Sequence, residues 1–407
     1  MVGMIGRATM AAVAVTMMVS AVPADAQKKK TPKFTKEVQG LLVKAQEAQQ
    51  AGNHAEVLQF LDQADAVANK NADDAYMINA LRLNTGVATN DNALIERAIE
   101  GALASGQVPP EDEQKFIRNL GALAMQRNDY AKALTQFERL LQTNPNDTEL
   151  LTQIAELQRR QKQPEKAVQT MQQAIQVQET AGQKAPEEWY RRTLAIAYDA
   201  KLPAQTNQAS LALLKAYPNS TNWRDSLLIF KEGGKFDDQM NLDILRLTRA
   251  NGALTGERDY IEYAETASAR GFPGEAKAVL DEGIAKGALE AGRPVVKELS
   301  GIISPKVASD KAALPGLEKE ARAAKTGRPA LATGDALLGY GQFAKAAEMY
   351  KVALSKGGAD ADTANLRMGF ALAQAGDKAG AEAAFKAVTG QRKPLAEYYL
   401  AWLGNLA

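Results

Sequence analysis

The feature that most constrains this chain is a segment that recurs at a fixed spacing of 34 residues. Five positions in one copy are matched by residues of like size in the next. The matched pairs are Leu120 and Ile154, Gly121 and Ala155, Ala133 and Ala167, Phe137 and Met171, and Leu140 and Ala174. A period of this length is typical of arrays in which each unit buries its apolar face against its neighbour. The sequence therefore predicts one extended array.

Each unit has the pattern of two helices. The first carries a large apolar residue followed by a small one, as in Leu120-Gly121. The second carries Ala133, Phe137 and Leu140, whose spacing places them on one helix face. Small residues let two helices approach closely, and a proline such as Pro145 ends the unit.

This order resembles the tetratricopeptide repeat (TPR) family. The resemblance implies an all-α fold, a right-handed superhelix (α-solenoid) of helix pairs whose first helices line a concave binding surface.

The same pattern of small and large apolar positions, called the frame below, recurs elsewhere with less regular residues. Its members are Ala45, Val57, Leu61 and Ala64; Ala264, Ala276, Leu280 and Gly283; Gly334, Ala346, Tyr350 and Ala353; and Gly369, Ala381, Phe385 and Val388. The second and third of these sets stand 70 residues apart, so we expect one degenerate helix pair within 291–328. In the irregular middle we expect Leu194-Ala195 and Tyr198 on one helix face, then an insertion around 202–205. The segment 394–402 is predicted to be a C-terminal capping helix.

The N-terminus has the pattern of a secretory signal. Arg7 precedes an apolar stretch over 11–22, and Ala24-Asp25-Ala26 supplies a small-residue cleavage site. A transmembrane anchor is the alternative, but the stretch is shorter than the ~20 residues that a span requires. The chain has no cysteine, which excludes a lipid anchor on cysteine and any disulfide. We expect a periplasmic or otherwise exported, soluble protein.

These patterns divide the chain into five segments. They are a signal peptide at 1–26, a flexible basic tail at 27–33, N-terminal TPR-like repeats at 34–180, an irregular TPR-like helical region at 181–290, and C-terminal TPR-like repeats with the capping helix at 291–407.

The composition argues against catalysis and against nucleic-acid binding. Lysine and arginine total 49 against 48 acidic residues, so no basic excess is available for nucleic acid. His54 is the single histidine and falls in a predicted turn. Acidic pairs at 73–74, 187–188 and 237–238 all fall at helix starts or turns, where carboxylates cap free N–H groups. We expect no enzyme activity, no cofactor and no metal site.

The predicted function is that of a periplasmic scaffold that binds a protein partner in a cell-envelope complex. The resemblance places its binding surface on the polar side of the first helices. The candidate residues are Arg118, Met125, Glu156, Arg159, Arg160, Trp189, Tyr190, Arg191 and Arg192. Two other functions stay open, a glycan or peptidoglycan binder that uses Trp189, Tyr190 and Trp223, and an all-helical enzyme that acts on the cell wall. For Trp189 and Tyr190, packing between repeats is a further alternative.

Overall fold

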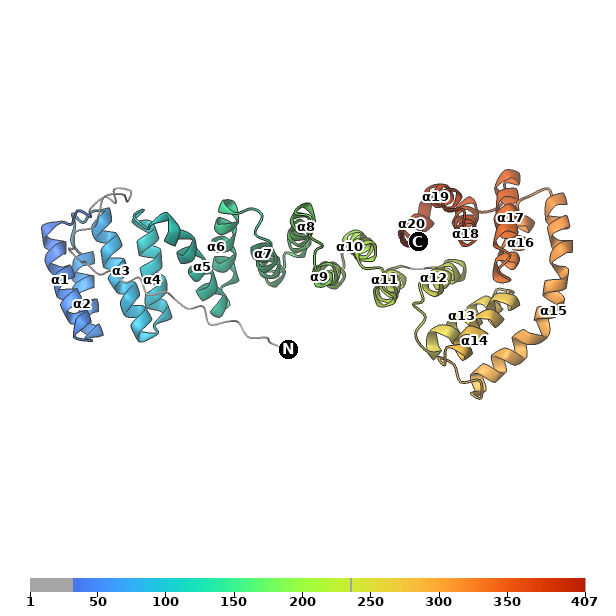
Figure 1. Cartoon of the computed structure of the whole chain (residues 1–407), viewed down its shortest axis with the longest axis horizontal. Helices are drawn as coiled ribbons and strands as arrows, with labels where there is room; N and C mark the ends of the chain where they lie inside the picture. Colours follow the sequence, from blue (N-terminus) through green and yellow to red (C-terminus); the bar gives the residue numbers. More distant parts are fainter. Residues whose placement is uncertain (1–31, 235, 407) are drawn as a thin grey trace. The chain divides into compact units, whose positions relative to one another are not determined.

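The computed structural model describes residues 32–406 except residue 235, and the described part of the chain is helical without strands. It forms two compact units, of which unit 1 ends at Gln183 and unit 2 begins at Lys184. The predicted signal peptide and the basic tail up to residue 31 lie outside the described residues. The helices are TPR-like antiparallel pairs, as the sequence predicted, and each unit is described separately below (Figure 1).

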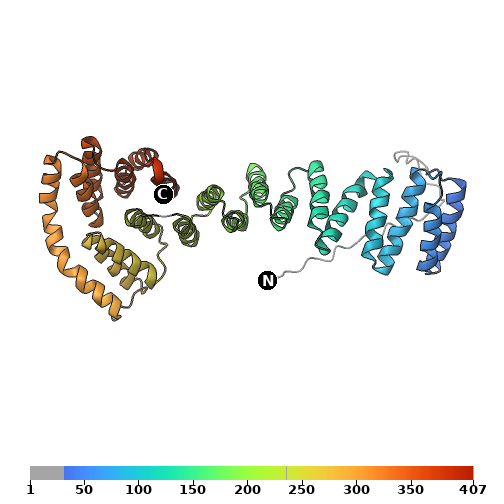
Figure 2. The same cartoon turned by 180° about the vertical axis from the view of Figure 1, so that it is seen from behind.

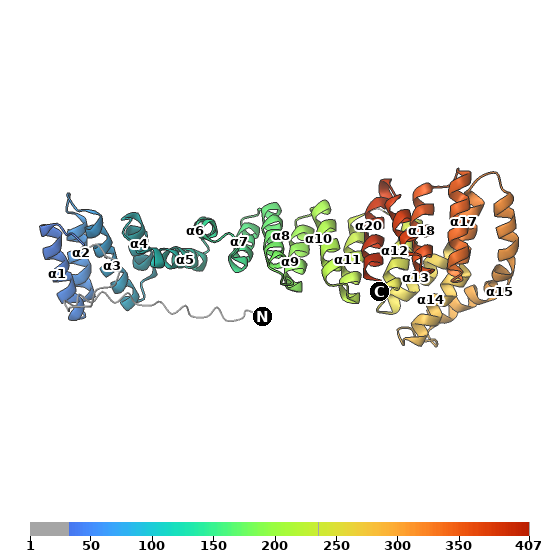
Figure 3. The same cartoon turned by 45° about the horizontal axis from the view of Figure 1, so that its top comes forward.

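Unit 1 consists of successive helix pairs. Its helices are α1 (Lys36–Gln50), α2 (His54–Asp65), α3 (Ala72–Thr89), α4 (Asn92–Ala104), α5 (Pro110–Gln126), α6 (Tyr130–Thr143), α7 (Thr148–Arg160) and α8 (Pro164–Thr180). Figure 3 shows α1 to α4 standing side by side. Each pair packs against the next, since α2 contacts α3, α4 contacts α5, and α6 contacts α7.

The large and small positions of the repeat explain how the two helices of a pair approach each other. A methyl group added at Gly121 on α5 would lie 2.2 Å from the ring of Phe137 on α6. Both Leu120 and Phe137 are buried in the core of unit 1. The glycine therefore makes room for the ring, and the ring fills the space that the missing side chain leaves.

In eight of the described helix pairs, the turn between the two helices contains one residue in the left-handed conformation. These residues are Gly52, Asn90, Asn128, Lys162, Lys201, Gly271, Gly341 and Gly376. This conformation lets the chain reverse between two antiparallel helices, and glycine and asparagine adopt it at the lowest cost. The recurrence of the turn shows that the unit of construction is the helix pair, even where the apolar repeat is faint.

Unit 2 continues with pairs and ends with additional helices. Its elements are α9 (Glu187–Asp199), α10 (Pro203–Ala216), α11 (Ser220–Gly233), α12 (Asp238–Ala250), α13 (Glu257–Ala269), α14 (Pro273–Ala285), α15 (Pro294–Ala323), α16 (Arg328–Gly339), α17 (Phe343–Lys356), α18 (Ala361–Gln374), α19 (Lys378–Lys386), the 3-10 turn η1 (Gly390–Arg392) and α20 (Lys393–Asn405). The predicted final helix is α20, and it contacts α18 and α19.

The prediction of a degenerate helix pair within 291–328 is wrong, because that region forms the single helix α15. Its first half packs Val296 and Ile303 into the same core as α13 and α14, and its second half packs Leu314 and Ala321 into the core of α16 and α17. A helix of this length extends about 45 Å. One helix thus takes the place of the two that the 70-residue spacing suggested.

The interpretation of α9 also needs correction. Leu194 is buried as expected, but Ala195 and Tyr198 are exposed. The buried face instead follows Tyr190, Leu194 and Ala197, which are spaced i, i+4, i+7. The expected insertion at 202–205 is absent, since Pro203 is the first residue of α10. Proline suits that position because a helix leaves its first N–H unbonded anyway.

The contact between glycine and an aromatic ring gives a testable prediction in unit 2. A methyl group added at Gly369 would lie 2.5 Å from the buried ring of Phe385. Gly369→Ala should therefore lower the free energy of unfolding, measured by urea denaturation, by about 1–3 kcal/mol. Gly301 on α15 has no atom within 4 Å of an added methyl group, so Gly301→Ala should raise it by about 0.5–1 kcal/mol. Equal effects of the two substitutions would contradict this account of the packing.

Candidate functional site

The middle of helix α12 is buried on all sides, which is unusual for a helix in an open array. The residues from Leu242 to Leu247 are all buried, and they include the charged Asp243 and Arg246. The reason is that the C-terminal part of unit 2 returns to the helices where the unit begins (Figure 2). Arg367 on α18 and Tyr399 on α20 both hydrogen-bond to Asp243, and α20 also contacts α10. Unit 2 is therefore closed on itself.

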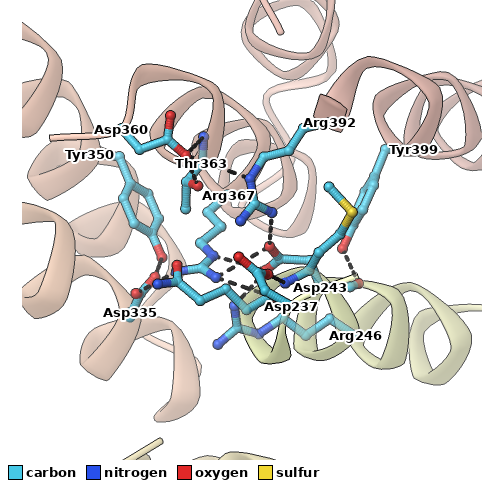
Figure 4. Close-up of polar contacts among 12 residues, drawn as sticks. Asp237, Asp243, Arg246, Asp335, Tyr350, Asp360, Thr363, Arg367, Arg392 and Tyr399 are labelled. Atoms are coloured by element: carbon cyan, nitrogen blue, oxygen red, sulfur yellow. Dashed lines mark hydrogen bonds and ion pairs between the residues drawn. The ribbon is translucent and has the colours of Figure 1, made fainter. Parts of the chain in front are cut away.

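Asp243 is the centre of this closure (Figure 4). Its carboxylate accepts hydrogen bonds from Arg367 Nε at 2.8 Å, Arg392 Nη1 at 2.9 Å and Arg246 Nη1 at 3.0 Å. Its backbone carbonyl oxygen accepts one from the Tyr399 hydroxyl at 2.6 Å. A single aspartate thus joins α12 to α18, to η1 and to the middle of α20.

Two more carboxylates complete what we call the Asp243 cluster, which comprises Asp243, Glu275, Asp335, Arg246, Arg367 and Arg392. Arg246 forms a two-pronged pair with Glu275, at 2.8 and 2.7 Å. Arg367 Nη1 donates to Asp335 Oδ2 at 2.6 Å. Three carboxylates thus face three guanidinium groups. Buried charges are tolerated when they are paired and hydrogen-bonded in this way.

The members of the cluster differ in how strongly they hold their charge. Burial would raise the pKa of Asp243, but Arg367 and Arg246 outweigh burial and hold that pKa below its usual value. The pKa of Glu275 is lowered in the same way, mainly because Arg246 outweighs its burial. Burial dominates at Asp335 and raises its pKa, although Arg367 opposes the shift. Asp335 is therefore the carboxylate that takes up a proton most readily.

Removing the charge at the centre should open the closure. Asp243→Asn leaves three buried guanidinium groups with two carboxylates, and loss of one member of a buried ion pair costs about 3–5 kcal/mol. The matched control is Asp225→Asn, which removes the exposed partner of Arg191 and should cost less than about 1 kcal/mol. Urea denaturation followed by circular dichroism measures both. Comparable losses in the two variants would show that Asp243 does not hold the unit closed.

Acid should also weaken the fold. A carboxyl group whose pKa is lower in the folded state stabilises the fold above its unfolded pKa, and that contribution is lost as the pH falls through the folded value. Asp243 and Glu275 both have lowered pKa values, whereas Asp335, with its raised pKa, contributes with the opposite sign. The free energy of unfolding should thus decrease below about pH 4. A fold that becomes more stable on acidification would contradict this.

A groove in unit 2 lies outside the cluster and has a volume of about 940 Å³. We call it the α10 groove, because the first turn of α10 forms one wall while the last turns of α9 and α11 and the start of α20 form the rest. Its apolar lining includes Tyr198, Leu202, Phe230, Phe236, Pro394 and Tyr398. Grooves of this size lined mainly by apolar and aromatic side chains are typical binding sites.

The floor of the α10 groove is built from contacting rings. Phe230 stacks on Phe236 with ring centres 5.0 Å apart, and it lies 5.0 Å from the ring of Tyr398. Tyr198 stands at the edge with 40% of its surface exposed, and its hydroxyl donates to Glu232 at 2.8 Å. The rings are thus held in place before any ligand arrives.

The predicted surface residues of unit 1 engage one another and their neighbours. Glu156 on α7 accepts hydrogen bonds from both Arg159 and Arg160, and Arg160 also lies over the ring of Tyr130. Arg118 on α5 faces Asp147 at 3.4 Å. Met125 is half-buried against the core of unit 1. The structure brings Glu156, Arg159 and Arg160 into one polar group.

In unit 2 the predicted residues separate into surface and core. Arg191 bonds to Glu187 at 3.1 Å and faces Asp225 on the next first helix, while Trp189 and Arg192 are half-buried.

Tyr190 is only 4% exposed and packs edge-on against Tyr217, so it belongs to the core and not to a binding surface. Trp223 is 1% exposed. Two of the three aromatic residues considered for glycan binding are therefore buried.

The sequence did not point to the Asp243 cluster or the α10 groove. A signal for the cluster existed, because Asp243 and Arg246 interrupt an apolar run and Arg367 lies directly after the buried Leu366. Their pairing spans 124 residues, which no local pattern reveals. Tyr198 was assigned to the buried face, and this misassignment hid the groove.

The described residues show neither a metal centre nor a membrane span. No group of three or more His, Asp or Glu side chains among them is arranged to hold a metal ion. None of the helices that the structure describes is long and apolar enough to cross a membrane. The acidic pairs found in the sequence have structural partners: Asp74 accepts from the N–H of Asn71 and of Thr35, Glu187 pairs with Arg191, and Asp237 caps α12.

Comparisons with known proteins find helical repeats. A family described as the TT21 fifth ARM repeats domain matches residues 119–225. No curated protein matches the chain.

Among solved structures, pilF of Pseudomonas aeruginosa is 13% identical, with 65% of this chain and 96% of that one covered and a TM-score of 0.24. A tetratricopeptide repeat protein from Parabacteroides merdae is also 13% identical, covering 81% and 99%, with a TM-score of 0.29. The P58(IPK) TPR domain is 14% identical, covering 90% and 98%, with a TM-score of 0.26.

Proposed function

We propose that this chain is a non-catalytic scaffold that binds a segment of another protein in the α10 groove, and that it works in the cell envelope after export. The observation that carries the proposal is the groove itself, an open recess of about 940 Å³ with a preformed aromatic floor. Aromatic side chains held in a recess are the usual anchors of protein–protein contacts, since they bury a large area at a small entropic cost.

The buried carboxylates of unit 2 favour a binding function over a catalytic one. Asp243, Glu275 and Asp335 are each engaged by an arginine, and all three are buried away from the groove. Because these side chains are engaged in ion pairs that close the unit, they keep unit 2 rigid. A rigid support lowers the ordering cost of binding at its surface.

The polar faces of α7 and α9 are proposed as further partner contacts. Helix α7 carries the exposed Arg159 and Arg160, and helix α9 carries the half-buried Trp189 and Arg191. Arginine and tryptophan are enriched among residues that dominate interface energies. The proposed envelope location is supported by the signal pattern at 1–26.

The test is site-specific crosslinking in the native cell. A photo-crosslinking residue in place of Tyr198 should yield one discrete crosslinked protein, recovered with a chain that begins at Gln27 after signal removal. The control places the same residue at Ile302, which is 45% exposed on α15, outside the groove. Equal crosslinking at both positions, or none at Tyr198, would count against a groove-binding scaffold. A chain still carrying residues 1–26 would count against export.

A further inference from the structure

The polar groups around the α10 groove are mainly hydrogen-bond acceptors. Asp199, at the end of α9, is exposed, and its carboxylate has no ion pair or hydrogen bond among the described residues. Asn207 donates through Nδ2 to Glu397 at 3.2 Å, but its Oδ1 is buried with no donor.

The end of α11 adds further acceptors to the same wall. This helix stops at Gly233, and Gly234 continues in an extended conformation. As in any helix, the last four carbonyl groups of α11 have no partner within the helix. The C-terminus of a helix carries a partial negative charge because these carbonyl groups are aligned. Glu232, in the last turn, adds a full negative charge at the groove.

The groove wall has fewer hydrogen-bond donors than acceptors, and most of these donors already bond to neighbouring residues. The hydroxyl of Tyr198 donates to Glu232, and that of Thr206 donates to the Leu202 carbonyl at 2.9 Å. Pro203, at the first position of α10, has no N–H to offer. Lys201 is the cationic side chain among the described lining residues. An apolar floor therefore lies beside a wall that is rich in acceptors.

We propose that the α10 groove selects a partner segment in which apolar side chains stand next to a lysine or arginine. The apolar side chains pack on Phe230, Phe236 and Tyr398. The cation lies between Asp199 and the end of α11, against the exposed face of the Tyr198 ring. Cations are attracted to the faces of aromatic rings and to the C-terminal end of a helix. This inference rests on the proposed scaffold function and adds the chemistry of the bound segment.

The experiment is selection from a phage-displayed library of random peptides on the immobilised full chain. Peptides that also bind the double variant Tyr198→Ala, Asp199→Lys are removed first. The remaining peptides should combine Lys or Arg with aromatic or aliphatic residues. Fluorescence anisotropy with an enriched, labelled peptide should then show at least a tenfold weaker Kd for the double variant, which corresponds to about 1.4 kcal/mol.

A matched control shows whether a loss of binding comes from the groove itself or from a general change in charge or folding. The double variant Ile302→Ala, Glu298→Lys on α15 makes the same kinds of change at exposed positions outside the groove, and it should bind the peptide as the unmodified chain does. Circular dichroism shows whether both variants remain folded. Enriched peptides that are acidic or purely apolar overturn the charge selection but leave a groove-binding scaffold standing. A selection that yields no groove-dependent peptide overturns both.

Discussion

One buried carboxylate decides the form of unit 2. Asp243 receives three arginines from different elements, Arg246 on its own helix, Arg367 on α18 and Arg392 just before α20. None of these charges is stable in a protein interior without the others. Apolar packing brings the same elements together, since Phe370, Tyr399 and Trp402 form one cluster of rings. Apolar packing is non-directional, whereas the geometry of the ion pairs fixes which turn of α12 meets which turn of α18.

Unit 1 is held by simpler means. Its pairs depend on a small residue facing a ring, as at Gly121 and Phe137, and on a left-handed residue in the turn. Both devices act within about one repeat length, so each pair depends mainly on itself and its neighbours. Unit 2 adds to these local devices a set of contacts between residues far apart in the chain. The same helix pair is therefore used in an open array and in a closed one.

This difference explains how much of the structure could be predicted from the sequence. The pairs and their buried positions follow from local patterns, and Leu120, Phe137, Gly369 and Phe385 lie where the frame placed them. The single helix α15 was missed because a spacing of 70 residues between two recognisable frames suggested a further helix pair, whereas one long helix spans that segment. Tyr198 was placed one position away from the true buried face of α9. The closure and the α10 groove were missed because they depend on pairings such as Arg367 with Asp243, which have no signature in the local sequence.

The return of α20 to α10 has a consequence for how the chain can change in length. Tyr399 bonds to Asp243, and Asn405 Nδ2 donates to the Leu214 carbonyl at 3.3 Å, so the final helix is fixed at its middle and at its end to helices far earlier in the chain. An extra helix pair inserted between α12 and α18 would displace both contacts at once. A duplication in unit 1 would only lengthen a stack. The number of helix pairs can therefore change in unit 1, whereas in unit 2 the contacts that close the unit fix that number.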